Sequence, residues 1–290
     1  TEQMDWEIYD LLGFGGLTPE IVEYITAYFD LCSEQFDAEK IVRLFKRLEQ
    51  FYVRWCEGEF IDAPPENLPQ KKMRLLKEQL PDQEKPLGQR QVDVYTGLNV
   101  MILLLELHRY AHNRDELKEQ IIFYPSGKLP EDASEDDLTL RLFRVIHYAD
   151  CLDDAWSFMG IVKPFFAHAK LARAFFGHIN FRSFNFSSAD FEEAVLSRAF
   201  FINANLASAN FKGANLIGAL FIRANLESAN LGSTNLHYAI LEGANLQNAN
   251  LSFADLDKII WDEDTNWEGV QGLDTAVNVP EALKRQLGLE

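Results

Sequence analysis

The chain has 290 residues, of which 47% are apolar and 25% charged, so it can bury hydrophobic cores and does not have the composition of a disordered protein. No apolar run is long enough to span a bilayer or to serve as a signal peptide. The three cysteines, Cys32, Cys56 and Cys151, are too few and too scattered for a disulfide framework. We therefore expect a cytoplasmic protein with reduced thiols and no membrane association.

The formal net charge of −18 is unevenly distributed along the chain. Residues 1–163 hold 31 acidic and 18 basic side chains, residues 164–262 hold 8 and 7, and residues 263–290 hold 6 and 2. The middle segment is therefore nearly neutral between acidic flanks. Because proteins bind nucleic acids mainly through basic side chains on phosphates, we expect no direct nucleic-acid binding.

Residues 1–163 have the pattern of an all-α domain. In residues 37–57 apolar side chains recur at helical spacing on one broad face. Thr18 followed by Pro19 is typical of a helix start, and the glycine-rich residues 13–16 mark the turn before it. We predict a bundle of five to seven helices, over residues 4–12, 19–33, 37–57, 68–79, 88–112 and 134–158.

Two pairs of candidate metal ligands lie in predicted helices of this domain. His108 and His112 are four residues apart, as are His147 and Cys151, so the two pairs could meet around a metal ion. Our interpretation is that they are packing or surface residues, because the glutamate of a metalloprotease motif is absent. No nucleophile with a positioned base can be proposed either. We predict no enzyme activity, no cofactor and no bound metal.

Between Ala169 and Leu256 the sequence repeats every five residues. All eighteen positions from Leu171 to Leu256 at this spacing are Leu or Phe, and Ala stands two residues before fifteen of them. Asn or Asp dominates the position between, as in residues 204–206. A period of five fits neither a helix nor a strand. The exceptions to Asn or Asp reveal a second period of twenty, so one coil has four sides; they include Phe200, Leu220, Ile240 and Ile260.

This tandem Ala-Asn-Leu pattern resembles the pentapeptide-repeat family, over about a third of the chain. The resemblance implies a right-handed quadrilateral β-helix in which the Leu or Phe and the Ala point inward. The expected fold class is therefore α + β multi-domain, an N-terminal all-α helical bundle followed by a right-handed quadrilateral β-helix, which is a β-solenoid, with a C-terminal cap.

We predict three domains. Residues 1–163 form the helical domain, residues 164–262 the β-helix, and residues 263–290 a cap with a short helix at residues 280–287. The coils should begin near Phe166, although residues 165–176 could instead form a helix. An uncovered last coil would expose unpaired backbone groups, which is why we expect the cap.

The outward apolar positions are the candidate interaction face. They are Phe200, Ile202, Ile217, Leu220, Ile222, Tyr238, Ile240 and Ile260. Soluble monomers normally cover a contiguous apolar patch of this kind. The helical domain, the C-terminal tail, a second copy of the chain or another protein could cover it. The repeat also carries His168, His178 and His237 at outer positions, where we expect them to be solvated.

The leading hypothesis is a non-enzymatic interaction or scaffold protein whose partner is another protein or a second copy in a homodimer. An alternative within the family is a DNA mimic that inhibits a type II topoisomerase, because some pentapeptide-repeat proteins imitate duplex DNA with an acidic rod. The near-neutral repeat argues against this alternative. A third hypothesis, a metal- or small-ligand-binding helical domain, depends only on the candidate ligands His108, His112, His147 and Cys151.

Overall fold

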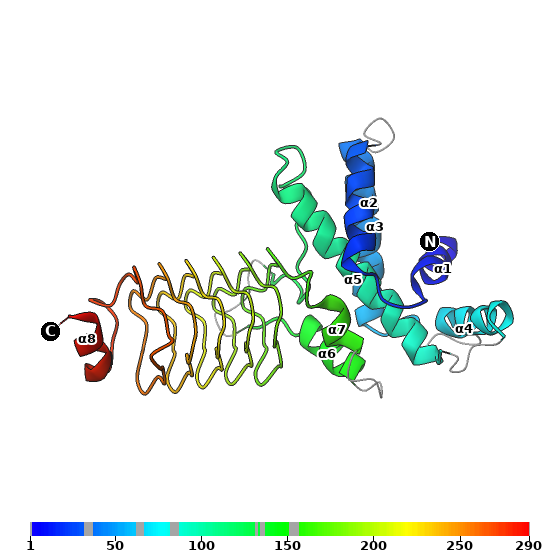
Figure 1. Cartoon of the computed structure of the whole chain (residues 1–290). Coiled ribbons are helices and arrows are strands. Elements are labelled where there is room, and N and C mark those ends of the chain that lie inside the picture. Colours follow the sequence, from blue (N-terminus) through cyan, green and yellow to red (C-terminus); the bar gives the residue numbers. More distant parts are fainter. Residues whose placement is uncertain are drawn as a thin grey trace. The chain divides into compact units, whose positions relative to one another are not determined.

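A computed structural model describes residues 2–31, 37–61, 67–81, 87–130, 133, 137–150 and 157–289, without the side chains of residues 149, 150 and 157–159. The chain divides into two compact units. The helical unit comprises Thr1–Phe123 and Arg144–Phe165, and the solenoid unit comprises Tyr124–Phe143 and Phe166–Glu290. Figure 1 shows the elements of each unit.

The helical unit is built around one long helix, α5. Helix α5 contacts α1, α2, α3, α4 and α7, and its residues from Leu98 to Met101 are fully or almost fully buried. The described helices that precede the coils are α1 (Glu2–Leu12), α2 (Pro19–Leu31), α3 (Ala38–Cys56), α4 (Leu68–Gln79), α5 (Gln89–His112), α6 (Arg141–Asp150) and α7 (Ser157–Val162). The helical character predicted for this region is confirmed, and α4 has the predicted bounds.

A buried side chain fixes the turn between α1 and α2. Asn99 of α5 accepts a hydrogen bond from the backbone N–H of Leu17 at 2.8 Å. Its amide nitrogen donates to the backbone oxygens of Leu12 and Gly15, at 2.9 and 2.7 Å. Gly15 adopts a positive φ of 75°, which glycine reaches without steric cost. The predicted turn is therefore confirmed, and Asn99 satisfies backbone groups that the turn itself cannot pair.

The predicted helix over residues 134–158 is wrong at its start. Thr139 instead forms a parallel bridge with Ala174 of the solenoid unit. The Thr139 N–H donates to the Arg173 oxygen at 3.0 Å, and the Thr139 oxygen accepts from the Phe175 N–H at 3.1 Å. Backbone paired in this way cannot belong to a helix, so α6 begins only at Arg141. The same pairing groups residues 124–143 with the solenoid, which differs from the predicted boundary at residue 163.

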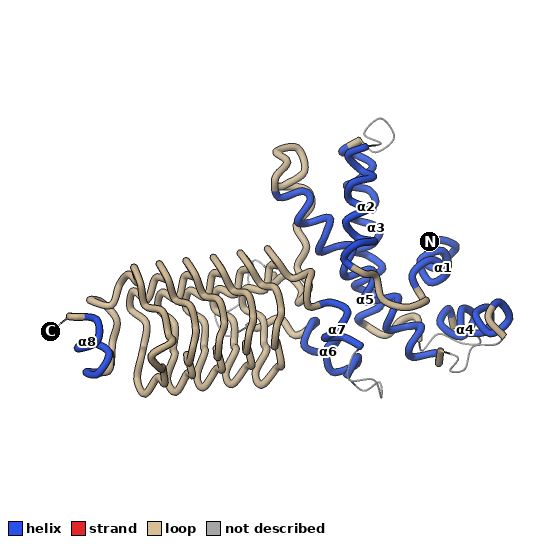
Figure 2. The backbone as a smooth tube through the Cα atoms, viewed as in Figure 1, coloured by secondary structure: helices blue, strands red, loops and turns tan. Residues whose placement is uncertain are grey.

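Single-residue parallel bridges hold the coils of the solenoid together. They join residues twenty apart, beginning with Lys170 and Asp190 and repeating at every fifth position through Ile240 and Ile260. Figure 2 draws the coils without strands, because each side contributes only one bridging residue. The coil predicted from Phe166 is confirmed, and the alternative helix over residues 165–176 is not formed.

The interior of the solenoid consists of the two predicted inward columns. The Ala residues and the Leu or Phe residues from Leu171 to Leu256 are buried to 0–1% exposure. Equivalent residues of successive coils stack on one another. The Phe191 and Phe211 rings, for example, lie parallel with centroids 5.0 Å apart. Phe201 and Phe221 do the same at 5.2 Å. Alanine fills the small space left beside these rings in the close-packed interior. Up to Leu256, larger residues occupy the same column only at Ile179, Phe184 and Thr234.

The last coil continues beyond the predicted end of the β-helix at residue 262. Asn266 and Gln271 bridge to residues 21 positions earlier, and Val277 to a residue 22 positions earlier, so the coil holds inserted residues but still pairs. The predicted C-terminal helix is confirmed as α8 (Glu281–Leu287), and its Leu283 is fully buried. The Trp261 indole also donates to Gln286 of this helix at 2.9 Å.

Where this insertion begins, one carboxylate takes the place of a backbone oxygen as hydrogen-bond acceptor. In regular coils the N–H two residues after each Leu or Phe donates to a backbone oxygen of the next coil, as Arg223 does to Glu242 at 2.8 Å. The Gly243 N–H donates instead to the side chain of Asp262 at 2.8 Å. This hydrogen bond is the largest cause of the lowered pKa of Asp262, and the Thr265 hydroxyl adds a second. The charged form of Asp262 therefore stabilises the last coil.

Replacing an inward alanine should destabilise the solenoid. Ala214 is almost completely buried, so Ala214→Leu should overpack the interior and lower the free energy of unfolding by about 1 to 3 kcal/mol. The matched control is Ser208→Leu on the exposed outside of the same repeat, which should change it little. Denaturant unfolding of the two variants measures the difference. Equal unfolding free energies would contradict the inward assignment of the alanine column.

The Asp262 contact should make the stability of the solenoid depend on pH. Because the folded pKa of Asp262 is below its ordinary value of 3.8, its contribution is present above about pH 4 and is lost as the pH falls through the folded pKa. Asp262→Ala should therefore lower the melting temperature at pH 7, and the difference from wild type should shrink below about pH 4. The exposed carboxylate Asp274 provides the control variant Asp274→Ala. A difference that is independent of pH would show that the carboxylate charge is not involved.

Candidate functional site

The candidate site is an apolar column on the outside of the coils. Parallel bridges join Phe200 to Leu220, Leu220 to Ile240, and Ile240 to Ile260, so these four residues stack directly over one another. Phe200 is 37% and Ile260 45% exposed, whereas Leu220 and Ile240 are half-buried between their neighbours. Their backbone groups are paired with adjacent coils. The side chains therefore present a continuous apolar stripe to the outside.

The other four predicted residues lie in the turns on both sides of this stripe. Ile202 and Ile222 follow column residues by two positions and are half-buried. Ile217 and Tyr238 precede column residues, and Tyr238 is 50% exposed. We call the eight residues together the apolar face. Each of them lies at an outward position, as the sequence predicted, although no described part of the solenoid unit buries Phe200, Tyr238 or Ile260.

A polar cluster borders the apolar face at Tyr238. The His237 Nδ1 atom lies 2.9 Å from the Asp257 carboxylate, one coil further on. The Lys258 ammonium lies 5.0 Å from the centre of the Tyr238 ring. Its pKa is raised, first by its contact with the Tyr238 side chain and then by Asp257. The expectation that His237 is simply solvated is therefore wrong, because the twenty-residue stacking places a carboxylate beside it.

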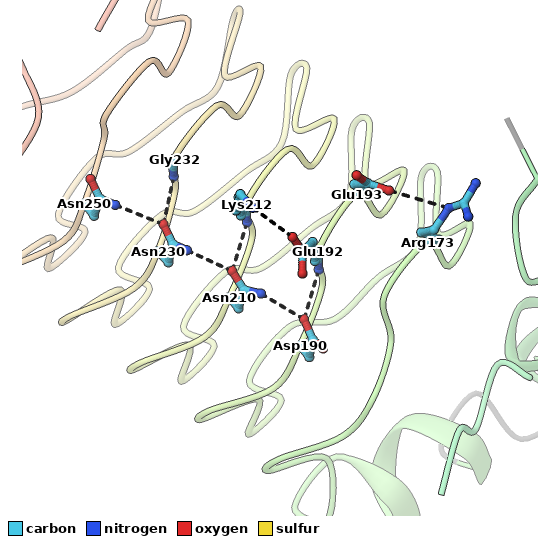
Figure 3. A network of polar contacts seen from close by, with 9 residues as sticks. All are labelled: Arg173, Asp190, Glu192, Glu193, Asn210, Lys212, Asn230, Gly232 and Asn250. Carbon is cyan, nitrogen blue, oxygen red and sulfur yellow. Dashed lines mark hydrogen bonds and ion pairs between the residues drawn. The ribbon is translucent and has the colours of Figure 1, made fainter. Parts of the chain in front are cut away.

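Two other outward columns have a different chemistry. In one, Asn205, Asn225, Asn245 and Asn266 each donate an amide hydrogen bond to the preceding coil, at 2.9 to 3.4 Å. In the other, shown in Figure 3, Asn210, Asn230 and Asn250 form the same ladder above Asp190, at 3.0 to 3.2 Å. Each amide oxygen also accepts from the backbone N–H two residues on, as Asn230 does from Gly232 at 3.2 Å. Asparagine thus stabilises both the turn and the stack.

The apolar column lacks both of these stabilising contacts. Among the described residues, none accepts a hydrogen bond from the backbone N–H of Ile202 or Ile222. Phe200 and Leu220 stand where asparagine would supply the acceptor, and their side chains have none. Each missing hydrogen bond is worth about 0.5 to 1.5 kcal/mol. The coil architecture alone would therefore favour asparagine at these positions, as it does at Asn180 in the same column, where the side chain accepts from Arg182 at 3.1 Å.

Charges on the outside of the coils are paired across neighbouring coils. Lys170 contacts Asp190 at 3.7 Å, and Lys212 contacts Glu192 at 3.3 Å. Arg173 and Glu193 also pair, at 3.6 Å, and Figure 3 shows two of these ion pairs. All three pairs join residues twenty apart. Because the acidic residues at these positions are paired with basic ones, they form no continuous acidic stripe. This agrees with the near-zero net charge of the repeat.

The weak metal-ligand candidates do not form a site among the described residues. His108 is buried, and its Nδ1 atom lies 3.1 Å from the Ile121 backbone oxygen. His112 and His147 are exposed, and Cys151 lies outside the described residues. No group of three His, Cys, Asp or Glu side chains in the described ranges could hold a metal ion. The packing role proposed for His108 is therefore supported by its burial.

Comparison with known proteins decides what the solenoid is. The family model described as Pentapeptide repeats matches residues 185–221 and 224–260, in eight copies. The solenoid is a pentapeptide-repeat domain. This identification covers the region of regular bridges and regular sequence, and the helical unit lies outside it.

Solved structures similar to the chain include other pentapeptide-repeat proteins. Rfr23 from the cyanobacterium Cyanothece 51142 is 36% identical, with a TM-score of 0.23, over 35% of this chain and 62% of that one. A protein of the Arabidopsis thaliana thylakoid lumen is 26% identical, with a TM-score of 0.23, over 38% of this chain and 71% of that one. QnrB1, a plasmid-mediated fluoroquinolone resistance protein, is 17% identical, with a TM-score of 0.15, over 43% and 91%.

Two further findings concern more of the chain than the repeat. A search of curated proteins found no match. In the described part of the chain, no helix combines the length and the apolar character that a membrane crossing requires.

Proposed function

We propose that the chain is a non-enzymatic interaction protein, and that its pentapeptide-repeat domain binds another polypeptide through the apolar face. The proposal depends mainly on one observation, the stack formed by Phe200, Leu220, Ile240 and Ile260. Apolar side chains stand there in place of the asparagine ladder of the two polar columns. Burying a fully exposed side chain of this kind is worth about 1.5 to 3 kcal/mol, and these partly exposed side chains leave a fraction of that free energy to be gained. A bound polypeptide would recover this free energy.

The molecule itself contains a precedent for a covered apolar side. Phe175 occupies the same middle position of the repeat on another side of the first coil. There the chain covers it: Thr139 pairs with the adjacent backbone, and the Phe143 ring packs edge-on against Phe175 with centroids 5.1 Å apart. An apolar residue at the middle position thus coincides with a contact to a further segment. The column from Phe200 to Ile260 has the same chemistry, but no described segment of the solenoid unit covers it in this way.

The surroundings of the apolar face also fit a protein partner. Protein interfaces combine a desolvated apolar centre, rich in aromatic residues, with a polar rim. Phe200 and the aliphatic residues of the column supply the centre, while His237, Asp257 and Lys258 supply polar groups at one border. The paired charges of the coils do not favour the DNA-mimic alternative, which needs an unneutralised acidic rod.

The same proposal includes the finer geometry of the coils. Four bridging positions per twenty residues, spaced evenly by five, support a square cross-section, and the family resemblance supports a right-handed coil. A rigid square solenoid would hold the apolar face flat and would bind without a large ordering cost.

A charge in the apolar column should abolish partner binding while the solenoid stays folded. Leu220→Asp places a carboxylate in the centre of the face, where burial against a partner is strongly unfavourable. If the partner is a second copy, light scattering should show a dimer for wild type and a monomer for the variant. If wild type is monomeric, proteins captured by it from the native cell should be missing from the variant.

The control for this experiment is Asn225→Asp, which adds the same charge on another side of the same coil. The melting temperature of Leu220→Asp should remain close to that of wild type, because the side chain points outward. A lower melting temperature without any change in mass or in captured proteins would contradict the proposal. It would show instead that the column is covered within the chain.

A further inference from the structure

The helical unit contains an apolar groove that the sequence did not reveal. Side chains from α1, α2, α3 and α5 line a hollow of about 330 Å³. Ile8, Val22 and Phe29 form buried parts of its lining. Leu11 on its border is 80% exposed, although leucine is usually buried. The groove is therefore an open apolar surface, and it is separate from the apolar face of the solenoid unit.

The helices on one side of the groove carry only negative charge. Residues 1–31, which contain α1 and α2, hold seven acidic side chains and no Lys or Arg; they are Glu2, Asp5, Glu7, Asp10, Glu20, Glu23 and Asp30. The three aspartates are paired with Arg54, Lys72 and Arg114, at 2.8 to 3.0 Å. Glu7, which lines the groove, forms no ion pair with a described basic residue. Glu23, beside Val22, lies near enough to Arg109 to help raise the pKa of that guanidinium. Both glutamates are exposed.

Two further charged residues line the groove. Glu106 of α5 is buried, and its carboxylate pairs with Arg109. Arg47 of α3 is exposed and is the one basic residue among the described residues that line the groove. The groove thus has an apolar centre with an acidic border along α1 and α2. A neutral or acidic ligand would leave Glu7 without compensation, whereas a basic one would neutralise Glu7 and add to the partial compensation that Arg109 gives Glu23.

We propose that the groove binds an amphipathic basic helix of a partner protein. The apolar face of that helix would contact Leu11 and the lining of the hollow, and its Lys or Arg residues would lie opposite Glu7 and Glu23. Grooves between helices recognise such segments through apolar residues spaced by three, four and seven positions. This binding does not depend on the apolar face of the solenoid unit, so either proposal can fail without the other.

The experiment uses the full chain and a labelled peptide of about 14 residues made of Leu and Lys, with the leucines on one helical face. Fluorescence anisotropy at physiological salt should detect saturable binding. A peptide with the same pattern but Glu in place of Lys should bind at least tenfold more weakly. A peptide of the same composition with the leucines scrambled around the helix should also bind at least tenfold more weakly.

Two pairs of variants locate the site. Glu7→Lys combined with Glu23→Lys should weaken binding of the Leu/Lys peptide at least tenfold, whereas Glu227→Lys combined with Glu263→Lys, which changes the net charge equally on the solenoid unit, should change it less than twofold. Leu11→Ser should weaken binding at least fivefold, and Leu289→Ser, at another exposed leucine, should leave it unchanged. All four proteins should keep the wild-type circular dichroism spectrum.

Three outcomes would overturn this proposal. Equal weakening by the two charge variants would show that the peptide responds only to net charge. Equal binding of the scrambled peptide would show that binding does not depend on an apolar face of the peptide helix. A wild-type dimer that Leu11→Ser converts to a monomer, without peptide binding, would assign the groove to a second copy of the chain instead.

Discussion

The constraint on which the solenoid depends is that backbone bridges join every fifth residue to the one twenty positions later. Because every side of the coil contributes one bridge, equivalent positions of successive coils stack directly over one another. The residues of one column must therefore pack against each other. Phenylalanine rings stack in parallel inside, asparagine amides form ladders outside, and opposite charges pair across coils. The nearly invariant Leu or Phe and Ala follow from this constraint, since one misfit residue would disturb both neighbouring coils.

The same constraint lets one side of the solenoid change without altering the others. Replacing asparagine by apolar residues from Phe200 to Ile260 leaves the backbone bridges intact, because the bridging groups belong to the main chain. The change removes turn and ladder hydrogen bonds but creates a continuous apolar stripe. This recurring loss of hydrogen bonds, coil after coil in one column, is the basis of our proposal that the column binds a partner. The helical unit adds a groove of different chemistry, which suits a basic segment better than another apolar wall.

Sequence periodicity predicted the coils, their register and the composition of each outward column, because all of these are local and repeat. It did not predict the left-handed backbone two residues after each Leu or Phe, where even Phe253 has a φ of 60°. The glycines at 213, 218 and 243 were the available signal for that turn. The pairing of Thr139 and the groove beside Leu11 depend on contacts between distant segments, and neither leaves a repeating pattern. The contact of His237 with Asp257 could have been found by applying the twenty-residue period to charges.

The most direct test of the stacking is a pair of cysteines introduced one coil apart. In a background without Cys32, Cys56 and Cys151, Asn205→Cys combined with Asn225→Cys should form a disulfide under mild oxidation, because bridged residues have the short Cα separation that a disulfide needs. Asn205→Cys combined with Asn230→Cys, on a different side of the coil, should stay reduced. Crosslinking at the spacing of 25 residues, or none at 20, would contradict the four-sided coil and the columns derived from it.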